Sequence, residues 1–353
     1  MHSRILEGEM AGSTMRFGLI GCGAIGELRA QALAQMEACQ LVAVTDVDLV
    51  RGKSLSQRFN CSMEADLNLL LKRDDIEAVI VSTPPSSHAE IGEAALQAGK
   101  HVLCEKPLTR TVAESKQLVK AAEKSGKFLG TGFNYRFYPS VLKARELFDS
   151  GLIGELDHIR SYAGYTAADH HQAWLHDANV MGGGALRDNG IHLIDLTLYF
   201  LGEAVQVKGF TSEAVWGFED CEDNGFALLR NPEGKIAALQ ASWTEWRGYK
   251  FLIDIYGTRG AIRASCFPML TQVTWAETTG GRTQSKSEYF PYIQVMEKLR
   301  SYRWVVVQSF IREFEAFTQA VQGKPSEIAT GMDGLRAVAV GEATSLGEKV
   351  LEL

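Results

Sequence analysis

One glycine-rich stretch near the start of the chain limits the possible folds more than any other feature. A short apolar run around Phe17 and Leu19 leads into Gly21-Cys22-Gly23-Ala24-Ile25-Gly26, and helical spacing follows. Strand, turn and helix in this order are typical of a dinucleotide-binding unit. The first glycine allows a tight turn, the second lets the backbone approach a pyrophosphate, and the third lets the helix pack on the strand. Residues 21–26 are therefore the predicted pyrophosphate site.

An acidic residue follows at the distance that such a unit uses for the adenosine ribose. Asp46 ends the next apolar run, twenty residues after Gly26. Its carboxylate can accept hydrogen bonds from the ribose hydroxyls and would repel a 2′-phosphate, which favours NAD over NADP. Arg51 is near enough in sequence to meet such a phosphate, so NADP stays possible.

Length and composition indicate a globular protein of two domains. The chain has 353 residues and a formal net charge of −7, with no segment that concentrates Lys and Arg, so we expect no nucleic-acid partner. No apolar run approaches the ~18 to 20 residues that cross a bilayer. Six scattered cysteines without a CxxC pair favour reduced thiols in the cytoplasm. Residues 1–14 carry charges and no apolar core, so we expect a flexible tail and not a secretory signal.

Strands and helices alternate up to residue 133. The pattern predicts strands at 41–44, 76–81, 101–103 and 128–133, with helices at 49–59, 89–98 and 111–125. Such alternation indicates a doubly wound parallel sheet, so residues 15–133 are the predicted dinucleotide-binding domain. The strand at 76–81 ends in Thr83-Pro84-Pro85, a rigid loop at the edge where such sheets bind ligands.

The pattern changes after Asn134. One helix is expected at 141–149, followed by strands at 156–165, 204–215, 226–229, 236–243 and 251–256 and by helical spacing at 302–321 and 332–351. Turns separate most of these strands, so we expect a large, mainly antiparallel sheet with one covered face. Residues 134–353 are then a second predicted domain of helices and strands. Residues 285–292 are expected to be a mobile loop.

Asp188 and His192 are four residues apart at the start of an expected helix. At that spacing the two side chains share a face and can touch. A carboxylate behind an imidazole fixes its tautomer and stabilises its protonated form, as acid/base pairs require. The same spacing also suits a purely structural bond within a helix, so spacing alone leaves both interpretations open.

Three motifs in order resemble one family. They are the Thr83-Pro84-Pro85 loop, Cys104-Glu105-Lys106-Pro107, and the run from Gly183 to His192. Together the motifs are similar to those of the Gfo/Idh/MocA oxidoreductases, over about residues 16 to 350. The resemblance implies an N-terminal Rossmann domain and a C-terminal α/β domain, residues 134–353, which binds substrate and whose open sheet forms a homodimer or homotetramer. It also implies NAD(P)-dependent hydride transfer with a secondary alcohol of a sugar, sugar derivative or inositol.

The resemblance carries roles onto individual residues. It implies that Lys106, Asp188 and His192 form the catalytic acid/base group, with His192 taking the proton. It implies contacts to substrate from Lys106, Arg136, Trp174, Asp188 and His192. The expected cofactor contacts are Gly21, Cys22, Gly23, Ala24, Ile25, Gly26, Asp46, Arg51, Thr83, Pro84, Pro85, His88, Glu105, Lys106 and Asn134.

Purely structural roles for these residues stay open beside the functional ones. Without its motif, Lys106 would be a solvated loop residue. His88 suits a structural role equally well, Arg136 could pair with an acid, and Trp174 could belong to a core.

Two other activities compete with a dehydrogenase as interpretations of this sequence. The alternative is an NAD-retaining, redox-neutral glycosidase of the same fold, and a non-catalytic NAD-binding regulator would not need the acid/base group. The histidines at 170, 171 and 176 fit no standard zinc spacing, so we expect no metal.

Overall fold

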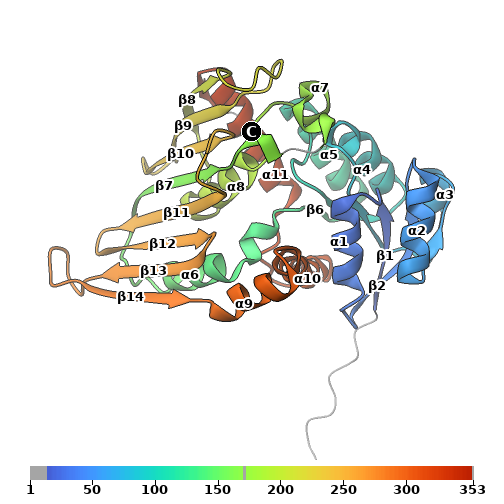
Figure 1. Cartoon of the computed structure of the whole chain (residues 1–353), viewed down its shortest axis with the longest axis horizontal. Coiled ribbons are helices and arrows are strands. Elements are labelled where there is room, and N and C mark those ends of the chain that lie inside the picture. Colours follow the sequence, from blue (N-terminus) through green and yellow to red (C-terminus); the bar gives the residue numbers. More distant parts are fainter. Residues whose placement is uncertain (1–13, 170–171, 352–353) are drawn as a thin grey trace, which may run out of the picture.

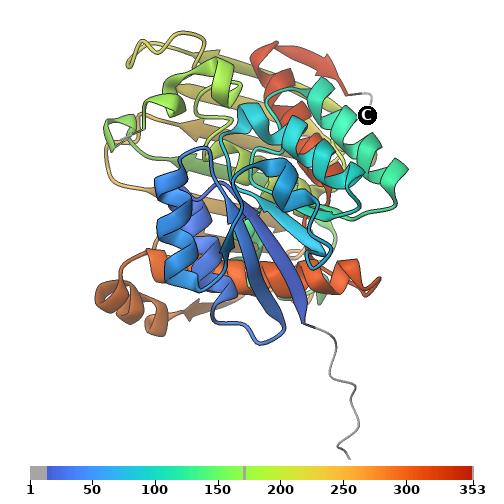
Figure 2. The same cartoon turned by 90° about the vertical axis from the view of Figure 1, so that its right-hand side faces the viewer.

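Two sheets organise the chain, one in each half (Figure 1). The computed structural model describes residues 14–169 and 172–351. In the side view of Figure 2 the first sheet and its helices, coloured blue to cyan, lie in front of the second sheet. The flexible tail predicted for the N-terminus lies outside the described residues, apart from Thr14.

The first sheet has six parallel strands in the order β3-β2-β1-β4-β5-β6. This is the order of a doubly wound dinucleotide-binding sheet, and the predicted fold class is confirmed. All four residues of β4 are buried, as expected of a strand covered on both faces. The strands are β1 (Met15–Ile20), β2 (Cys39–Thr45), β3 (Ser62–Met63), β4 (Ala78–Val81), β5 (His101–Cys104) and β6 (Leu129–Thr131).

Side-chain caps begin the predicted helices of this half. The Asp48 carboxylate accepts hydrogen bonds from two amides of α2, and the Thr111 hydroxyl accepts one from α5, which satisfies donors that a helix start leaves unpaired. The expected segment 49–59 is confirmed as α2. The helices are α1 (Ala24–Leu33), α2 (Leu49–Phe59), α3 (Leu67–Leu71), α4 (His88–Gln97) and α5 (Val112–Ser125).

A helix from the far end of the chain completes the core of the first sheet. The rings of Phe314 and Phe317 on α10 (Arg303–Val321) lie 5.4 and 6.0 Å from that of Phe17 on β1. Helix α10 also packs on α1, the helix of the glycine motif. A division at residue 133 therefore separates α10 in sequence from the sheet on which it packs.

The second sheet has nine strands in the order β14-β13-β12-β11-β7-β10-β9-β8-β15. Neighbouring strands are antiparallel except β7 and β10, which are parallel. The strands are β7 (Leu156–Gly164), β8 (Gln206–Ser212), β9 (Asn224–Arg230), β10 (Ile236–Ser242), β11 (Lys250–Gly257), β12 (Gly260–Cys266), β13 (Met269–Trp275), β14 (Gln284–Tyr289) and β15 (Glu348–Val350).

Among the described residues, three helices pack on one face of this sheet and no helix covers the other. They are α6 (Pro139–Asp149), α8 (Gly190–Leu201) and α11 (Gly331–Ser345), and the shorter α7 (Ala178–Met181) and α9 (Pro291–Arg300) lie outside this layer. The mainly antiparallel sheet with one covered face is confirmed.

The sequence pattern failed at the edges of the second sheet. The loop predicted at 285–292 is strand β14 followed by the start of α9, and the helix predicted to reach Leu351 ends at Ser345, before β15. Strands β12 and β13 were not anticipated. Most residues of β14 are exposed, because an edge strand without a covering helix needs no apolar face, and so periodicity does not reveal it.

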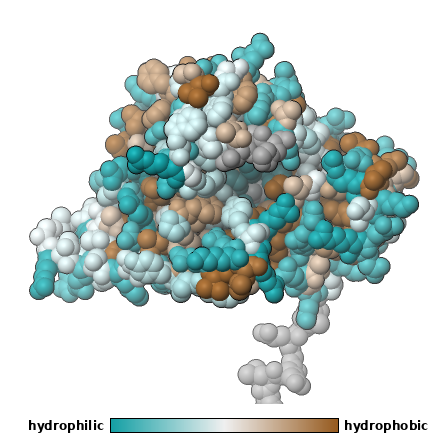
Figure 3. All heavy atoms as spheres, viewed as in Figure 1, coloured by the Kyte–Doolittle hydropathy of each residue, from teal (hydrophilic) through white to brown (hydrophobic). Residues whose placement is uncertain are grey.

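Hydrophilic side chains cover most of the molecular face in Figure 3, and hydrophobic ones form separate small groups. Among the residues that the structure describes, no helix is long and apolar enough to cross a membrane.

Candidate active site

The glycine turn has the geometry of a pyrophosphate cradle. Gly21 has a φ of 93°, and a Cβ there would lie 2.6 Å from the carbonyl oxygen of Ser82. A Cβ on Gly26 would lie 2.1 Å from the carbonyl oxygen of Gly21, so helix and turn touch. A Cβ on Gly23 would meet no described atom within 4 Å, and no side chain caps α1. The turn is thus tight, closely packed behind and open in front, which fits a bound pyrophosphate.

Asp46 is held against the same turn. One carboxylate oxygen accepts the amide of Cys22 at 2.6 Å and the other accepts that of Asp48 at 2.8 Å. The Arg51 guanidinium lies 3.9 Å from Asp46 and 3.5 Å from Asp48. Two carboxylates therefore already face the arginine that could favour a 2′-phosphate.

His88 joins the two loops that follow β4 and β5. Its Nε2 lies 2.8 Å from the carbonyl oxygen of Thr83 and its Nδ1 lies 2.9 Å from that of Pro107. The ring is fully buried, and burial lowers its pKa. Both ring nitrogens face backbone, so the side chain has the structural role that the sequence left open.

Glu105 points toward a buried arginine. Its carboxylate accepts the Nε–H of Arg29 on α1 at 2.7 Å, and Arg29 also donates to Glu313 on α10. Arg29 and Glu313 are fully buried. Burial raises the pKa of Glu313 to about 7, although Arg29 acts in the opposite direction. This ion-pair cluster joins α1, α10 and the loop that carries Lys106.

Lys106 and Asp188 meet although 82 residues separate them in the sequence. The Lys106 Nζ donates to the backbone oxygen of Asp188 at 2.9 Å and lies 3.5 Å from its Oδ1. The hydroxyl of Tyr165 donates to Oδ2, and the indole nitrogen of Trp243 donates to the same oxygen at 3.3 Å. Lys106 is therefore directed at the loop of Asp188, whose side chain is held by Tyr165 and Trp243, the residues that directly follow β7 and β10.

His192 is a buried imidazole beside this pair. It lies on the first turn of α8 and stacks on the ring of Tyr135, with centroids 4.2 Å apart. Burial and the positive charges of Lys106 and Arg29 lower its pKa well below the usual value, so the ring is neutral at pH 7. Among the described residues, Nδ1 of His192 has no hydrogen-bond partner.

The predicted arrangement of Asp188 and His192 is therefore wrong in one respect. Helix α8 begins at Gly190, so Asp188 precedes it and the helical spacing does not apply. Nδ1 of His192 does not receive the expected carboxylate bond. The turn from Gly184 to Asp188 instead directs the carboxylate toward Lys106, Tyr165 and Trp243.

Arg136 and Asn134 face the interior between the two sheets. Arg136 makes a two-pronged ion pair with buried Asp195, at 2.9 and 2.6 Å, which is the acid pairing that the sequence left open. Its contact with substrate stays a prediction. The amide of Asn134 donates to Ser309 on α10 at 2.8 Å. Trp174 is half-buried in a short 3-10 turn over residues 173–176.

Tyr165 and Trp243 were not recognised from the sequence. They lie just beyond the carboxyl ends of β7 and β10, the parallel pair of the second sheet, where Gly164 is level with Ser242. Aromatic residues at two such strand ends are a signal only when the pairing is known.

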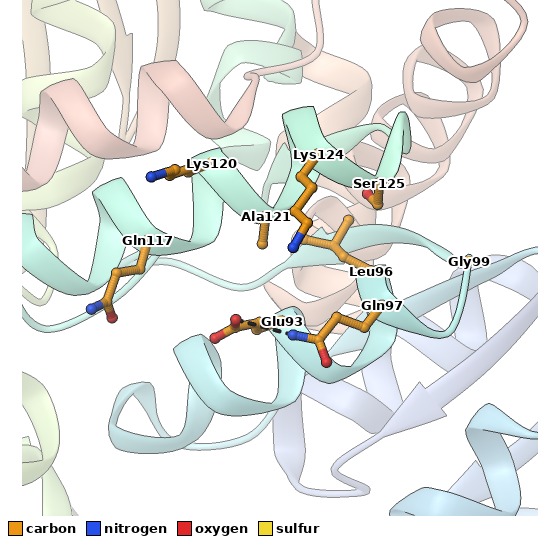
Figure 4. Close-up of a pocket in the computed structure, with 9 residues that line it drawn as sticks. All are labelled: Glu93, Leu96, Gln97, Gly99, Gln117, Lys120, Ala121, Lys124 and Ser125. Atoms are coloured by element: carbon orange, nitrogen blue, oxygen red, sulfur yellow. Dashed lines mark hydrogen bonds between the residues drawn. The ribbon is translucent and has the colours of Figure 1, made fainter.

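A groove of about 630 Å³ lies elsewhere, between α4 and α5 (Figure 4). Polar side chains such as Glu93, Lys120 and Lys124 line most of it, and it contains none of the predicted site residues. Among the described residues, no group of three or more His, Cys, Asp or Glu could hold a metal ion. His170 and His171, two of the three histidines considered as zinc ligands from the sequence, lie outside the described residues.

Several known proteins with similar sequences and structures are named as dehydrogenases. The chain is 29% identical over 344 residues to inositol 2-dehydrogenase of Rhizobium meliloti, covering 95% of this chain and 98% of that protein. It is 28% identical over 284 residues to levoglucosan dehydrogenase of Pseudarthrobacter phenanthrenivorans, covering 70% and 73%. A levoglucosan dehydrogenase structure with NADH and levoglucosan has a TM-score of 0.84 at 25% identity, covering 96% and 99%.

Two family models account for most of the chain. Residues 15–133 match the oxidoreductase family with an NAD-binding Rossmann fold, and residues 141–263 match the GFO/IDH/MocA C-terminal domain. The glycine turn, Asp46 and the Lys106 loop all lie within the first match. The chain therefore belongs to the Gfo/Idh/MocA family of NAD-binding oxidoreductases.

Proposed function

We propose that this protein is an NAD-dependent dehydrogenase that oxidises a secondary alcohol of a sugar, a sugar derivative or a cyclitol. The observation that carries the proposal is the contact of Lys106 with Asp188, near enough to buried His192 for the Lys106 charge to lower its pKa. The names of the inositol and levoglucosan dehydrogenases support the substrate class, because both act on ring compounds rich in hydroxyls.

Lys106, Asp188 and His192 have different roles in removing the proton from the substrate hydroxyl. Bound NAD supplies the hydride acceptor. His192 takes the proton, because its lowered pKa keeps the ring neutral and its buried position excludes water. Lys106 donates a hydrogen bond to the reacting oxygen and orients it, while Asp188 holds the ammonium group. The Asp188 carboxylate offsets the positive charge of the Lys106 ammonium group.

Aromatic rings supply the wall for the substrate ring. Tyr165 and Tyr249 stack at 5.5 Å, and the hydroxyl of Tyr249 lies 3.0 Å from that of Tyr135. Tyr135 in turn stacks on His192. Such surfaces combine apolar faces with hydroxyl groups, which suits a ring with both C–H faces and hydroxyls.

The open face of the second sheet is the proposed contact in a homodimer or homotetramer. Phe210 on β8 is paired with Phe226 on β9, and Leu228 lies two residues further along. These side chains are 81%, 49% and 57% exposed in the single chain. Exposed apolar groups that lie together mark association surfaces. The cysteines of the described residues are free thiols, which agrees with the proposed cytoplasmic location.

The test is NAD reduction by a panel of inositols, aldoses, anhydrosugars and glycosides. Lys106→Ala is the blank, and Lys120→Ala, which removes an exposed lysine of α5, is the matched control. We expect one compound class to reduce NAD, at least 100-fold more slowly with Lys106→Ala. Equal rates in Lys106→Ala and the wild type would refute the catalytic assignment.

The same panel separates the dehydrogenase from the redox-neutral alternative. The experiment includes this alternative because one relative, 27% identical over 256 residues, is named a 2,7-anhydro-N-acetylneuraminate hydratase and not a dehydrogenase. Cleavage of a chromogenic glycoside without accumulation of NADH would establish the alternative.

A further inference from the structure

A segment just before β9 contacts the turn before Asp188 directly and reaches the Asp188 side chain through Trp243. We infer that Glu222, in this Cys221–Asp223 segment, is a positioning residue that holds Asp188 in register with Lys106. The inference rests on the proposed function, because it assigns Glu222 a role through Asp188.

The first contact clamps the glycine turn that leads to Asp188. One carboxylate oxygen of Glu222 accepts the amide of Gly184 at 2.8 Å, and the other accepts the amide of Leu186 at 2.7 Å. The backbone oxygen of Glu222 accepts the amide of Ala185 at 2.9 Å. Three consecutive amides of the turn therefore point at one residue. A Cβ on Gly184 would lie 2.2 Å from the Glu222 oxygen, so this close approach requires glycine.

The second contact reaches the Asp188 side chain through Trp243. The backbone oxygen of Asp223 accepts the amide of Trp243 at 2.7 Å, and the indole of Trp243 donates to Oδ2 of Asp188. The Asp223 carboxylate accepts the amide of Val215 at 2.6 Å, which closes the loop between β8 and β9. One segment thus holds both the backbone before Asp188 and a donor to its carboxylate.

Burial of the Glu222 carboxylate costs free energy unless hydrogen bonds compensate for the lost water. The residue is 5% exposed, and burial raises its pKa against the lowering effect of the two amides. The buried charge is matched mainly by those amides, whose position determines where the Asp188 carbonyl meets Lys106 Nζ at 2.9 Å. The contacts of Glu222 therefore bear on the lysine through the loop and not directly.

The experiment is a double-mutant cycle with Glu222→Gln and Asp188→Asn. Glutamine keeps the length of the side chain but turns an NH2 group toward one of the two amides. We expect Glu222→Gln to lower kcat about tenfold, as for one lost charged hydrogen bond, and to shift the pH profile of kcat, while the Kd for NAD stays within twofold. In the Asp188→Asn background the same change should lower kcat less than twofold, because the carboxylate that the clamped turn directs toward Lys106 is already lost.

Thr271→Val is the matched control. It removes a buried hydrogen bond to the Ser140 backbone oxygen in the same half of the chain, on β13, three strands away from β7. We expect it to lower the melting temperature without changing kcat or its pH profile. Hydrogen exchange without substrate supplies a second readout, since residues 182–188 should exchange faster in Glu222→Gln and at the wild-type rate in Thr271→Val.

Each outcome decides a separate point. An unchanged kcat in Glu222→Gln, or full additivity with Asp188→Asn, would overturn the role of Glu222. If Asp188→Asn itself kept the wild-type kcat, the proposed function of Asp188 would fail instead. If Glu222→Gln does not fold, Trp243→Phe tests the second contact: it should lower kcat without changing the Kd for NAD, and an unchanged kcat would overturn the inference.

Discussion

Replacing Glu313 by glutamine should change how stability depends on pH. Glu313 is fully buried against Arg29, and its pKa is raised from 4.5 to about 7. A carboxyl group with a raised pKa in the folded state binds more protons there than in the unfolded chain. Its contribution to stability is therefore present below pH 4.5 and is lost as the pH rises through about 7.

The size of the effect follows from these two pKa values. Linkage gives a contribution of about 2 kcal/mol at pH 5.5 and almost none at pH 8.5. Glutamine resembles the protonated form and does not titrate. The difference in unfolding free energy between wild type and Glu313→Gln should therefore change by about 2 kcal/mol between pH 5.5 and 8.5, with the variant relatively more stable at high pH.

Urea unfolding at the two pH values measures this difference. Glu315→Gln is the matched control, because it removes the same charge from an exposed position on the same helix. The difference between the control and the wild type should not depend on pH. If the difference for Glu313→Gln were equally independent of pH, the argument from burial would be refuted.

Three further predictions follow from the site and the open sheet face. Asp46→Ser should weaken NAD binding about tenfold or more, because the ribose hydroxyls lose a charged acceptor. The preference of the protein for NAD over NADP should also decrease, which titrations with both cofactors measure. An unchanged ratio of the two Kd values would contradict this. Because the pKa of His192 is lowered in the folded state, the unfolded chain binds more protons than the folded one below about pH 6.5. The free energy of unfolding therefore decreases as the pH drops below that value. His192→Asn should lose less stability than wild type between pH 7 and 5 in denaturant titrations, and equal losses would count against it. Phe226→Asp should reduce the oligomer to smaller species in sedimentation experiments, with NAD affinity unchanged, whereas an intact oligomer would place the contact elsewhere.

Local sequence was sufficient wherever a few neighbouring residues decide the conformation. The glycines at 21, 23 and 26 restrict backbone and close contacts within one turn. Capping by Asp48 and Thr111 likewise depends on residues two or three positions away, and the helices that they begin were predicted almost to the residue. Where the apolar period was absent, as in β14, the prediction failed because nothing local distinguishes an exposed edge strand from a loop.

The sequence by itself determined the parallel sheet and the glycine turn, and its motifs predicted Lys106, Asp188 and His192 as members of one site. Only the tertiary structure decided which groups these residues meet. Arg136 pairs with Asp195, Glu105 reaches Arg29, and Asp188 is held by the residues that directly follow β7 and β10. Partner choice in a buried site depends on charges and donors that approach from distant segments, because each buried polar group must be satisfied by whatever the packing places beside it.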